Sequence, residues 1–310
     1  MNSRTIFNNK KRRNQFIFYT SIVILPFIQF LIMYVGVNFR SILFVFQKYN
    51  EYEAEYATKF SYFGENIAEA WNNLFGNNVN LTYAWKNTLI SYSVGLLMTF
   101  INIFICFFIY KKVLFAGWFK VVFYIPSIVN GFVTIFAFRY FVERGLPRIF
   151  PNNPIFTESG GLIANANTAF WALTIYTIWS GLGGGLILTI GQMSRTSVSV
   201  LEAAKIDGVN IFQEFIHVVW PVLYPVVTIG LYTGVTGIFL AGPPTFAFFG
   251  ESADPQLYTF GYYMFTLVVG NKSSAAAYPI SATMGIMFTC VAAPMVFALK
   301  HWFETHDPNN

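Results

Sequence analysis

The sequence predicts an all-α integral membrane protein with six membrane-spanning helices. Hydrophobic residues make up 55% of its 310 residues and charged residues only 11%, against roughly 25% charged in an ordinary soluble domain. The apolar residues gather in six runs without a single charged side chain. Each run is long enough for an α-helix to cross a hydrocarbon core about 30 Å thick.

The first half of the chain is expected to hold three of these spans. Segment 1–15 is polar and basic, and the first span follows at 16–37. Its length, and the lack of a small-residue cleavage site close behind it, favour an uncleaved helix over a signal peptide. Segment 38–86 is rich in Glu and predicts an external loop with some helix. The second and third spans are expected at 88–110 and 121–138.

The second half is expected to hold the other three. An external loop rich in Pro and Asn, 143–167, leads to the fourth span at 168–193 and the fifth at 222–249, where Pro243 and Pro244 predict an early helix end. The run 257–270 is too short to cross and favours an interfacial or re-entrant segment. With the sixth span at 278–299, residues 16–300 form one six-helix domain, followed by a tail at 301–310.

Charge decides the expected orientation. Six spans place both termini on one side, and cytoplasmic loops of membrane proteins carry an excess of Lys and Arg. The side of the N-terminus would hold most of the basic residues: Arg4, Lys10, Lys11, Arg12, Arg13, Lys111, Lys112, Lys120, Arg195, Lys205 and Lys300. We therefore expect both termini to lie in the cytoplasm.

The most polar run of the second half, 201–225, lies between the fourth and fifth spans. Its first residues predict a short helix that Gly208 ends, because glycine is unfavourable inside a helix and suits a C-terminal turn. Asn210 then predicts the cap of a second helix, with Gln213 at the spacing of a capping box. Pro221 and Pro225 fall near the start of the next span, where proline is tolerated.

This run resembles the cytoplasmic loop signature, called the EAA motif, of permease subunits in binding-protein-dependent ABC importers. The match rests on nine positions in order: Glu202, Ala203, Ala204, Asp207, Gly208, Phe215, Ile216, Pro221 and Pro225. The resemblance implies that the short helix is a coupling helix, which docks on an ATPase subunit and transmits its closure. The residues expected to carry this coupling are Glu202, Ala203, Ala204, Asp207, Gly208, Phe215 and Pro221.

The resemblance also implies an assembly. Its members would be a second, similar permease, two copies of a cytoplasmic ATPase that bind ATP and Mg²⁺, and an external substrate-binding protein, in a bacterial cytoplasmic membrane. The pattern is most similar to the larger of the two permeases in carbohydrate importers of the maltose and oligosaccharide type. Val209, where the family usually has alanine, and Ala241-Gly242-Pro243-Pro244, where it usually has Gly-Gly-Pro, weaken any claim about a particular sugar.

A carbohydrate path would need aromatic faces beside hydroxyl and amide groups, because the C–H faces of a sugar ring stack while its hydroxyls hydrogen-bond. Five residues at mid-depth of the third, fourth and fifth spans fit that description: Asn130, Tyr176, Trp179, Tyr232 and Thr236. Ordinary helix packing remains the competing interpretation for each of them.

Other functions find less support. The glycines at 181 and 183–185 lie in an uncharged span without a lysine, which favours close helix packing or local unwinding over a phosphate loop, so ATP is expected on another chain. No catalytic or metal-ligating constellation is seen among the three His and two Cys, and the basic residues are too scattered for nucleic acid. The alternative function is a stand-alone secondary carrier or channel for a small polar solute, with a membrane enzyme behind it.

Overall fold

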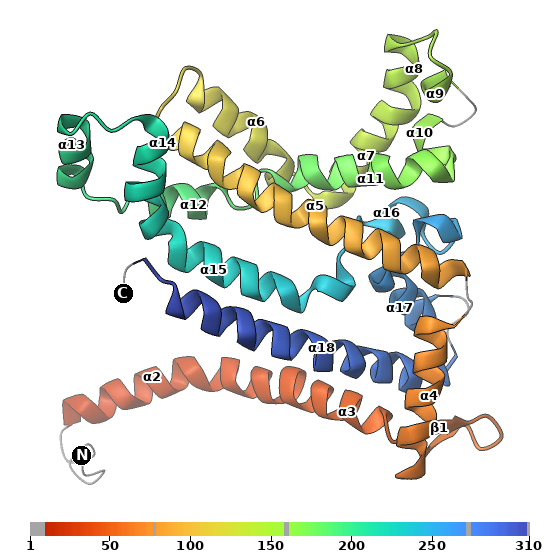
Figure 1. Ribbon diagram of the computed structural model, residues 1–310. Helices are drawn as coiled ribbons and strands as arrows, with labels where there is room; N and C mark the ends of the chain where they lie inside the picture. Colours follow the sequence, from red (N-terminus) through yellow and green to blue (C-terminus); the bar gives the residue numbers. More distant parts are fainter. Residues whose placement is uncertain (1–9, 77–78, 158–160, 271–273, 309–310) are drawn as a thin grey trace. The chain divides into compact units, whose positions relative to one another are not determined.

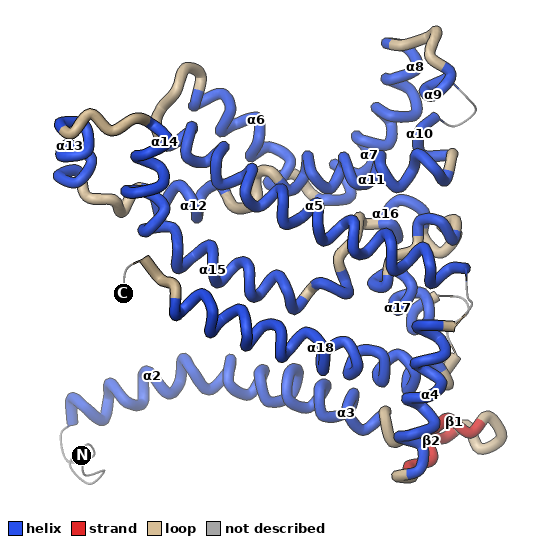
Figure 2. The backbone as a smooth tube through the Cα atoms, viewed as in Figure 1, coloured by secondary structure: helices blue, strands red, loops and turns tan. Residues whose placement is uncertain are grey.

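The computed structural model describes residues 10–76, 79–157, 161–270 and 274–308, and these are helical almost throughout (Figure 2), which confirms the all-α class. Residues 1–9 of the predicted basic N-terminal segment, including Arg4, lie outside the described residues. Contacts divide the chain into two compact units. One comprises the chain up to Asn72 with Ser274–Ile286, and the other Asn73–Ser273 with Met287–Asn310.

The first unit begins with a long helical run made of α2 (Lys10–Gln29), a π-helical stretch η1 (Phe30–Gly36) and α3 (Val37–Phe44). It extends beyond the predicted end at residue 37. The polar side chains that follow do not stop the helix, because Asn38 donates to the carbonyl of Tyr34 (2.6 Å) and Ser41 to that of Val37 (3.0 Å). Polar residues near a predicted span end therefore continue the helix instead of ending it.

A β-hairpin follows, which the sequence analysis did not predict. Strands β1 (Gln47–Asn50) and β2 (Glu55–Thr58) pair antiparallel, and helix α4 (Ser61–Phe75) comes next. The buried amide of Asn66 on α4 donates to the carbonyls of Val45 and Gln47, both at 2.9 Å. Strands of only four residues with mixed polarity leave too weak a pattern to be predicted from the sequence. The hydrogen bonds of Asn66 attach α4 to the start of the hairpin.

The second unit contains α5 (Val79–Tyr110), a continuous helix of 32 residues that includes the predicted second span. The third predicted span, 121–138, is wrong as a single helix. The chain bends by 107° between α6 (Ala116–Ile128) and the helical run Gly131–Ile149, which begins with α7 (Gly131–Tyr140). The reason is Asn130, whose side chain accepts from the N–H of Phe132 (2.9 Å) and so caps a new helix.

The expected loop at 143–167 contains short helical segments between irregular turns: η2 (Phe141–Gly145), α8 (Leu146–Ile149), α9 (Pro154–Thr157) and α10 (Gly161–Ala164). The fourth predicted span is a bent pair, α11 (Ala166–Gly181) and α12 (Leu186–Met193), at 44°. The glycines unwind the helix here, as expected. A Cβ on Gly183 would lie 2.3 Å from the carbonyl oxygen of Phe123, so α6 approaches this turn closely.

The fifth predicted span, 222–249, is wrong at both ends. The helical run starts at Ile211 and comprises α14 (Ile211–Glu214), η3 (Phe215–Val219) and α15 (Trp220–Thr236). Gly237 ends it because glycine favours helix termini. Pro243 and Pro244 therefore lie beyond the helix, in a non-helical segment between η4 (Ile238–Leu240) and α16 (Thr245–Phe249).

The last elements are η5 (Pro255–Leu257), α17 (Phe260–Val269) and α18 (Ala277–Thr305). Helix α17 has 10 residues, too few to cross a membrane. Among the described residues, four helices are long and apolar enough to cross, and the number rises to six if each bent pair counts as one span. The chain is thus a multi-pass membrane protein whose spans are partly broken.

One hydrophobic cluster of the second unit positions the loop discussed below. It joins the C-terminal half of α5 to α12, η3 and α15 through buried side chains: Ile103, Cys106, Phe107, Ile109, Leu186, Met193, Phe215, Val219, Leu223 and Val227. The elements that flank the polar loop therefore share a packed core with the end of α5.

Candidate functional site

The helix expected at Glu202 is α13 (Val198–Ile206), and Gly208 ends it as predicted. The φ angle of Gly208 is +72°, in the left-handed region that favours glycine. The N–H of Val209 donates to the carbonyl of Ala204 (3.1 Å), and that of Gly208 to the carbonyl of Lys205 (3.2 Å). These two bonds form a Schellman motif, which fixes the direction in which the chain leaves α13.

Helix α13 is exposed on most of its surface. Figure 1 shows it at one extremity of the second unit, joined to α12 and α14 by short connections. Within α13 only Ala204 is buried, while Glu202 and Ala203 are exposed. Apolar side chains are exposed too, with Val198 at 68% and Ile206 at 86%. A helix of this kind, apolar and charged together, is a surface suited to a protein partner.

The second helix of the loop begins with the capping box that the sequence predicted. The side-chain oxygen of Asn210 accepts from the N–H groups of Phe212 (3.0 Å) and Gln213 (2.9 Å). In return, the side chain of Gln213 accepts from the N–H of Asn210 (3.0 Å). The capping box and the Schellman motif therefore define both sides of the turn between α13 and α14.

Phe215 and Pro221 act on the inner side of the loop. The Phe215 ring lies 5.0 Å from that of Phe104 and 4.9 Å from that of Phe107, both on α5. Pro221 has no N–H to donate to the carbonyl four residues earlier, and the helix is π-helical over the preceding turn. Of the predicted coupling residues, these two are placed to anchor the loop, whereas Glu202, Ala203 and Asp207 are exposed on it.

An ion pair that the sequence analysis missed joins α14 to α5. The Lys111 amino group contacts both carboxylate oxygens of Glu214, at 2.8 and 2.7 Å, and Glu214 is only 7% exposed. Both residues lie outside the six charge-free runs, between the predicted spans. A signal was present in the sequence, because Glu214 stands directly before an apolar run.

Of the five residues predicted for a carbohydrate path, two have their rings close together, Tyr176 and Trp179. Asn130 is exposed and caps α7, and Thr236 is exposed at the end of α15. Tyr176 is buried, with its hydroxyl 2.9 Å from that of Thr134, and its ring lies 6.1 Å from that of Trp179. Tyr232 is half-buried. The structure thus brings Tyr176 and Trp179 together and gives Asn130 and Tyr176 structural partners.

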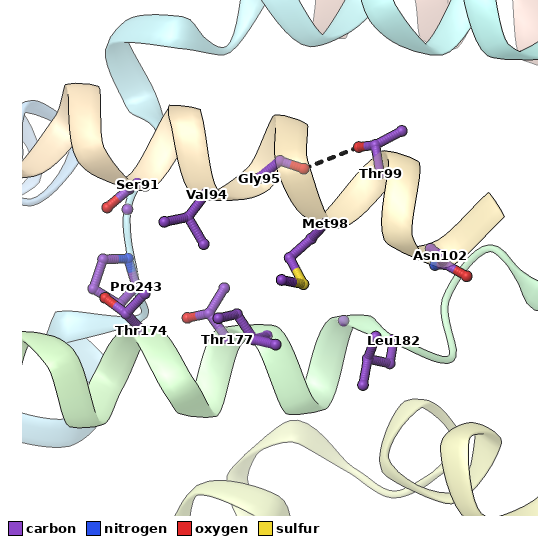
Figure 3. Close-up of a pocket in the computed structure, with 13 residues that line it drawn as sticks. Ser91, Val94, Gly95, Met98, Thr99, Asn102, Thr174, Thr177, Leu182 and Pro243 are labelled. Atoms are coloured by element: carbon purple, nitrogen blue, oxygen red, sulfur yellow. Dashed lines mark hydrogen bonds between the residues drawn. The ribbon is translucent and has the colours of Figure 1, made fainter. Parts of the chain in front are cut away.

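A pocket in the same unit, with a largely apolar wall that also carries hydroxyl and amide groups and is called the polar pocket below for those groups, involves none of those five residues (Figure 3). It encloses about 290 Å³ between α5, α11 and the segment after η4. It is lined by Ser91, Val94, Gly95, Met98, Thr99, Asn102, Thr174, Thr177, Ile178, Gly181, Leu182, Gly242 and Pro243. The sequence contains a signal for this pocket in its helical period. The small or polar residues 91, 95, 99 and 102 share one face of α5.

The pocket is built to hydrogen-bond without charge. Its described lining contains hydroxyl and amide groups but no acidic or basic side chain. Thr99 donates to the carbonyl of Gly95 (3.0 Å; Figure 3), so its oxygen still has capacity to accept. The hydroxyl of Ser91 is buried without a hydrogen-bond partner within the described chain. Such groups match a neutral solute with many hydroxyls.

Comparison with known proteins places this geometry in context. No family model matches the sequence. A solved bacterial ABC transporter that imports the acidic polysaccharide alginate matches with a TM-score of 0.70, 16% identity, and coverage of 96% of this chain and 98% of that one. A second structure, of a bacterial alginate transporter in complex with its alginate-bound periplasmic protein, matches with a TM-score of 0.60 at 16% identity and covers 94% and 95% of the two chains.

Sequence relatives agree with the structural match. The chain is 28% identical over 129 residues to AmyD of Thermoanaerobacterium thermosulfurigenes, a probable permease for starch degradation products. It is 23% identical over 189 residues to MsmF of Streptococcus mutans, a multiple sugar-binding transport system permease. The chain is thus similar in sequence to sugar permeases of ABC importers and similar in fold to a solved ABC importer. The aligned region covers 42% of this chain and 44% of AmyD, and 61% of this chain and 63% of MsmF, so the chain matches less than two thirds of the length of either relative.

Proposed function

We propose that this permease forms, with a second permease, the pathway of a carbohydrate importer powered by two partner ATPase subunits. The observation that carries the proposal is the exposed helix α13. The turn that follows it is capped on both sides, and α14 leads from that turn into the packed cluster. ATP and Mg²⁺ would be bound by the partners, and the chain itself would catalyse no reaction. An external binding protein would deliver the solute.

The pocket supports a neutral oligosaccharide as the solute. The solved relative imports an acidic polysaccharide, whose carboxylates would call for basic partners inside a site. The described lining of the pocket offers hydroxyl and amide groups instead. We therefore infer a neutral sugar, and the names of AmyD and MsmF, both sugar permeases, agree with that choice.

Co-purification tests the main function against the alternative of a stand-alone carrier or channel. The tagged permease, expressed with its chromosomal neighbours and extracted in mild detergent, is expected to retain an ATPase at two copies per permease pair. A permease that purifies without an ATPase and still mediates solute flux in vesicles would contradict the importer and support the alternative.

The cytoplasmic position of the loop is a separate prediction. A single cysteine in place of Arg195, in a chain lacking Cys106 and Cys290, is expected to react with a membrane-impermeant maleimide only after the cells are permeabilised. Arg195 lies between α12 and α13, next to the proposed docking helix. Glu69→Cys, exposed on α4, is the matched control and should react in intact cells. Labelling of position 195 in intact cells would overturn the orientation.

Asn102 tests the pocket. Asn102→Leu keeps a similar volume but removes two kinds of hydrogen-bonding group, each bond being worth about 0.5–1.5 kcal/mol. We expect uptake of radiolabelled neutral oligosaccharides to fall about tenfold, while ATPase binding is unchanged. Ser93→Ala, on the exposed side of the same helix, should have no effect. If Trp179→Ala lowers uptake and Asn102→Leu does not, the path follows Tyr176 and Trp179 instead.

A further inference from the structure

Two segments 103 positions apart meet at the ion pair of Lys111 and Glu214. Lys111 directly follows the last residue of α5, and Glu214 is the last residue of α14. The Lys111 side chain is 24% exposed and that of Glu214 9%. Both carboxylate oxygens accept from one amino group, so neither is left without a charged partner. This contact is much better shielded from water than a surface salt bridge.

The ion pair is one of two adjacent contacts that join the same elements. Phe215, the next residue after Glu214, packs against two rings of α5 and belongs to the buried cluster. Apolar packing alone tolerates small rotations and slides, whereas the buried ion pair also limits how far α14 and the end of α5 can separate. Together the two contacts attach α14 to the end of α5 as a single body.

Helix α13 has no comparable attachment of its own. Ala204 is its one buried residue, and its connection to α14 runs through the Schellman turn and the capping box. A force applied to α13 therefore reaches the rest of the unit through its two chain connections, to α12 and to α14. On the α14 side, the Lys111–Glu214 contact passes that force to α5.

Helix α5 continues without a break from the ion pair to the pocket. Asn102 lies nine residues before Lys111 on the same helix, which corresponds to a rise of roughly 14 Å. A continuous helix is stiff over that distance. Displacement of its end at Lys111 must move the pocket wall formed by Ser91, Thr99 and Asn102.

We propose that Lys111 and Glu214 form a clasp that transmits movement of α13 to α5 and so to the polar pocket. This proposal rests on the proposed function, in which α13 docks on an ATPase. Lys111 and Glu214 are positioning residues, since neither lines the pocket nor lies on α13. They keep α14 and α5 in one register when the ATPase closes.

The reactivity of a cysteine placed in the pocket shows whether movement of the ATPase changes the pocket. This measurement does not require the sugar to be known. Thr99→Cys, in a chain lacking Cys106 and Cys290, is placed in the complex with its ATPase in lipid nanodiscs. Its reaction rate with N-ethylmaleimide is measured with and without ATP and vanadate. With the clasp intact we expect ATP and vanadate to change this rate about tenfold or more.

Removal of both charges of the ion pair tests the transmission of movement without destabilising the permease. Lys111→Met with Glu214→Gln leaves no orphaned buried charge, so the protein should fold and keep its ATPase. We expect the ATP-dependent change at Thr99→Cys to drop below about twofold. The charge swap, Lys111→Glu with Glu214→Lys, should restore most of it, and Lys112→Gln, an exposed neighbour, should leave it intact.

The results that would overturn the clasp are distinct from those that would overturn the importer. A full ATP-dependent change in the doubly neutral variant, or loss of its ATPase, contradicts transmission through the clasp. A wild-type chain that binds no ATPase contradicts the proposed function. In that case, hydrogen exchange of the full-length permease tests whether the Lys111–Glu214 contact holds α14 in place. Faster exchange in α14 of Lys111→Gln, by about tenfold, supports the clasp, and unchanged exchange refutes it.

Discussion

Glu202→Lys is expected to release the ATPase from the purified complex while the permease stays folded. Glu202 is exposed on α13, so its carboxylate has no role in the core that the substitution would disturb. Docked against another protein, it would be buried and would need a basic or hydrogen-bonding partner. Loss of one partner from a buried charged pair weakens association by more than about a hundredfold. Size-exclusion chromatography of the complex, with quantified ATPase, measures this.

Two further variants make the result specific. Glu202→Gln removes the charge without adding repulsion, so its complex should be weakened less than that of Glu202→Lys. Glu69→Lys reverses another exposed carboxylate, on α4 and outside the loop sequence, and should retain the full ATPase. If Glu202→Lys kept normal ATPase stoichiometry and normal uptake, the coupling role of this helix would be lost, and the stand-alone carrier would regain support.

Gly208→Val is expected to uncouple transport from ATP hydrolysis without lowering the amount of permease in the membrane. The left-handed conformation costs roughly 1–2 kcal/mol for a residue with a Cβ, and more for a β-branched one. That range reduces the population of the correct turn by about fivefold to thirtyfold. We expect uptake to fall by a similar factor while ATP is still hydrolysed, measured side by side in proteoliposomes.

The surroundings of Gly208 make this test clean. A Cβ at this position meets no atom within 4 Å beyond the adjacent residues, so the effect of valine is expected to come chiefly from the backbone conformation. Gly208→Asn is the matched control, because asparagine adopts the left-handed region far more readily. Asparagine should retain most of the coupling. Equal losses for asparagine and valine would show that the turn geometry is not what matters.

The sequence alone determined the class of the protein and the local structure of the loop at 201–225. Charge-free apolar runs of about 20 residues are typical of membrane-spanning helices, and local rules sufficed for the turn: Gly208 ends α13, and Asn210 with Gln213 caps α14. These features depend on residues within one or two helical turns. They are therefore readable without knowledge of the fold.

The tertiary structure alone decided the break in the third span and the contacts between distant segments. The cap at Asn130 competes with an apolar run that hydropathy treats as continuous, and the helix breaks there by 107°. The Lys111–Glu214 pair and the pocket bring together residues that are far apart in the chain. No local pattern reveals such partners, because burial of a charge or a hydroxyl is favourable only when the fold supplies its counterpart.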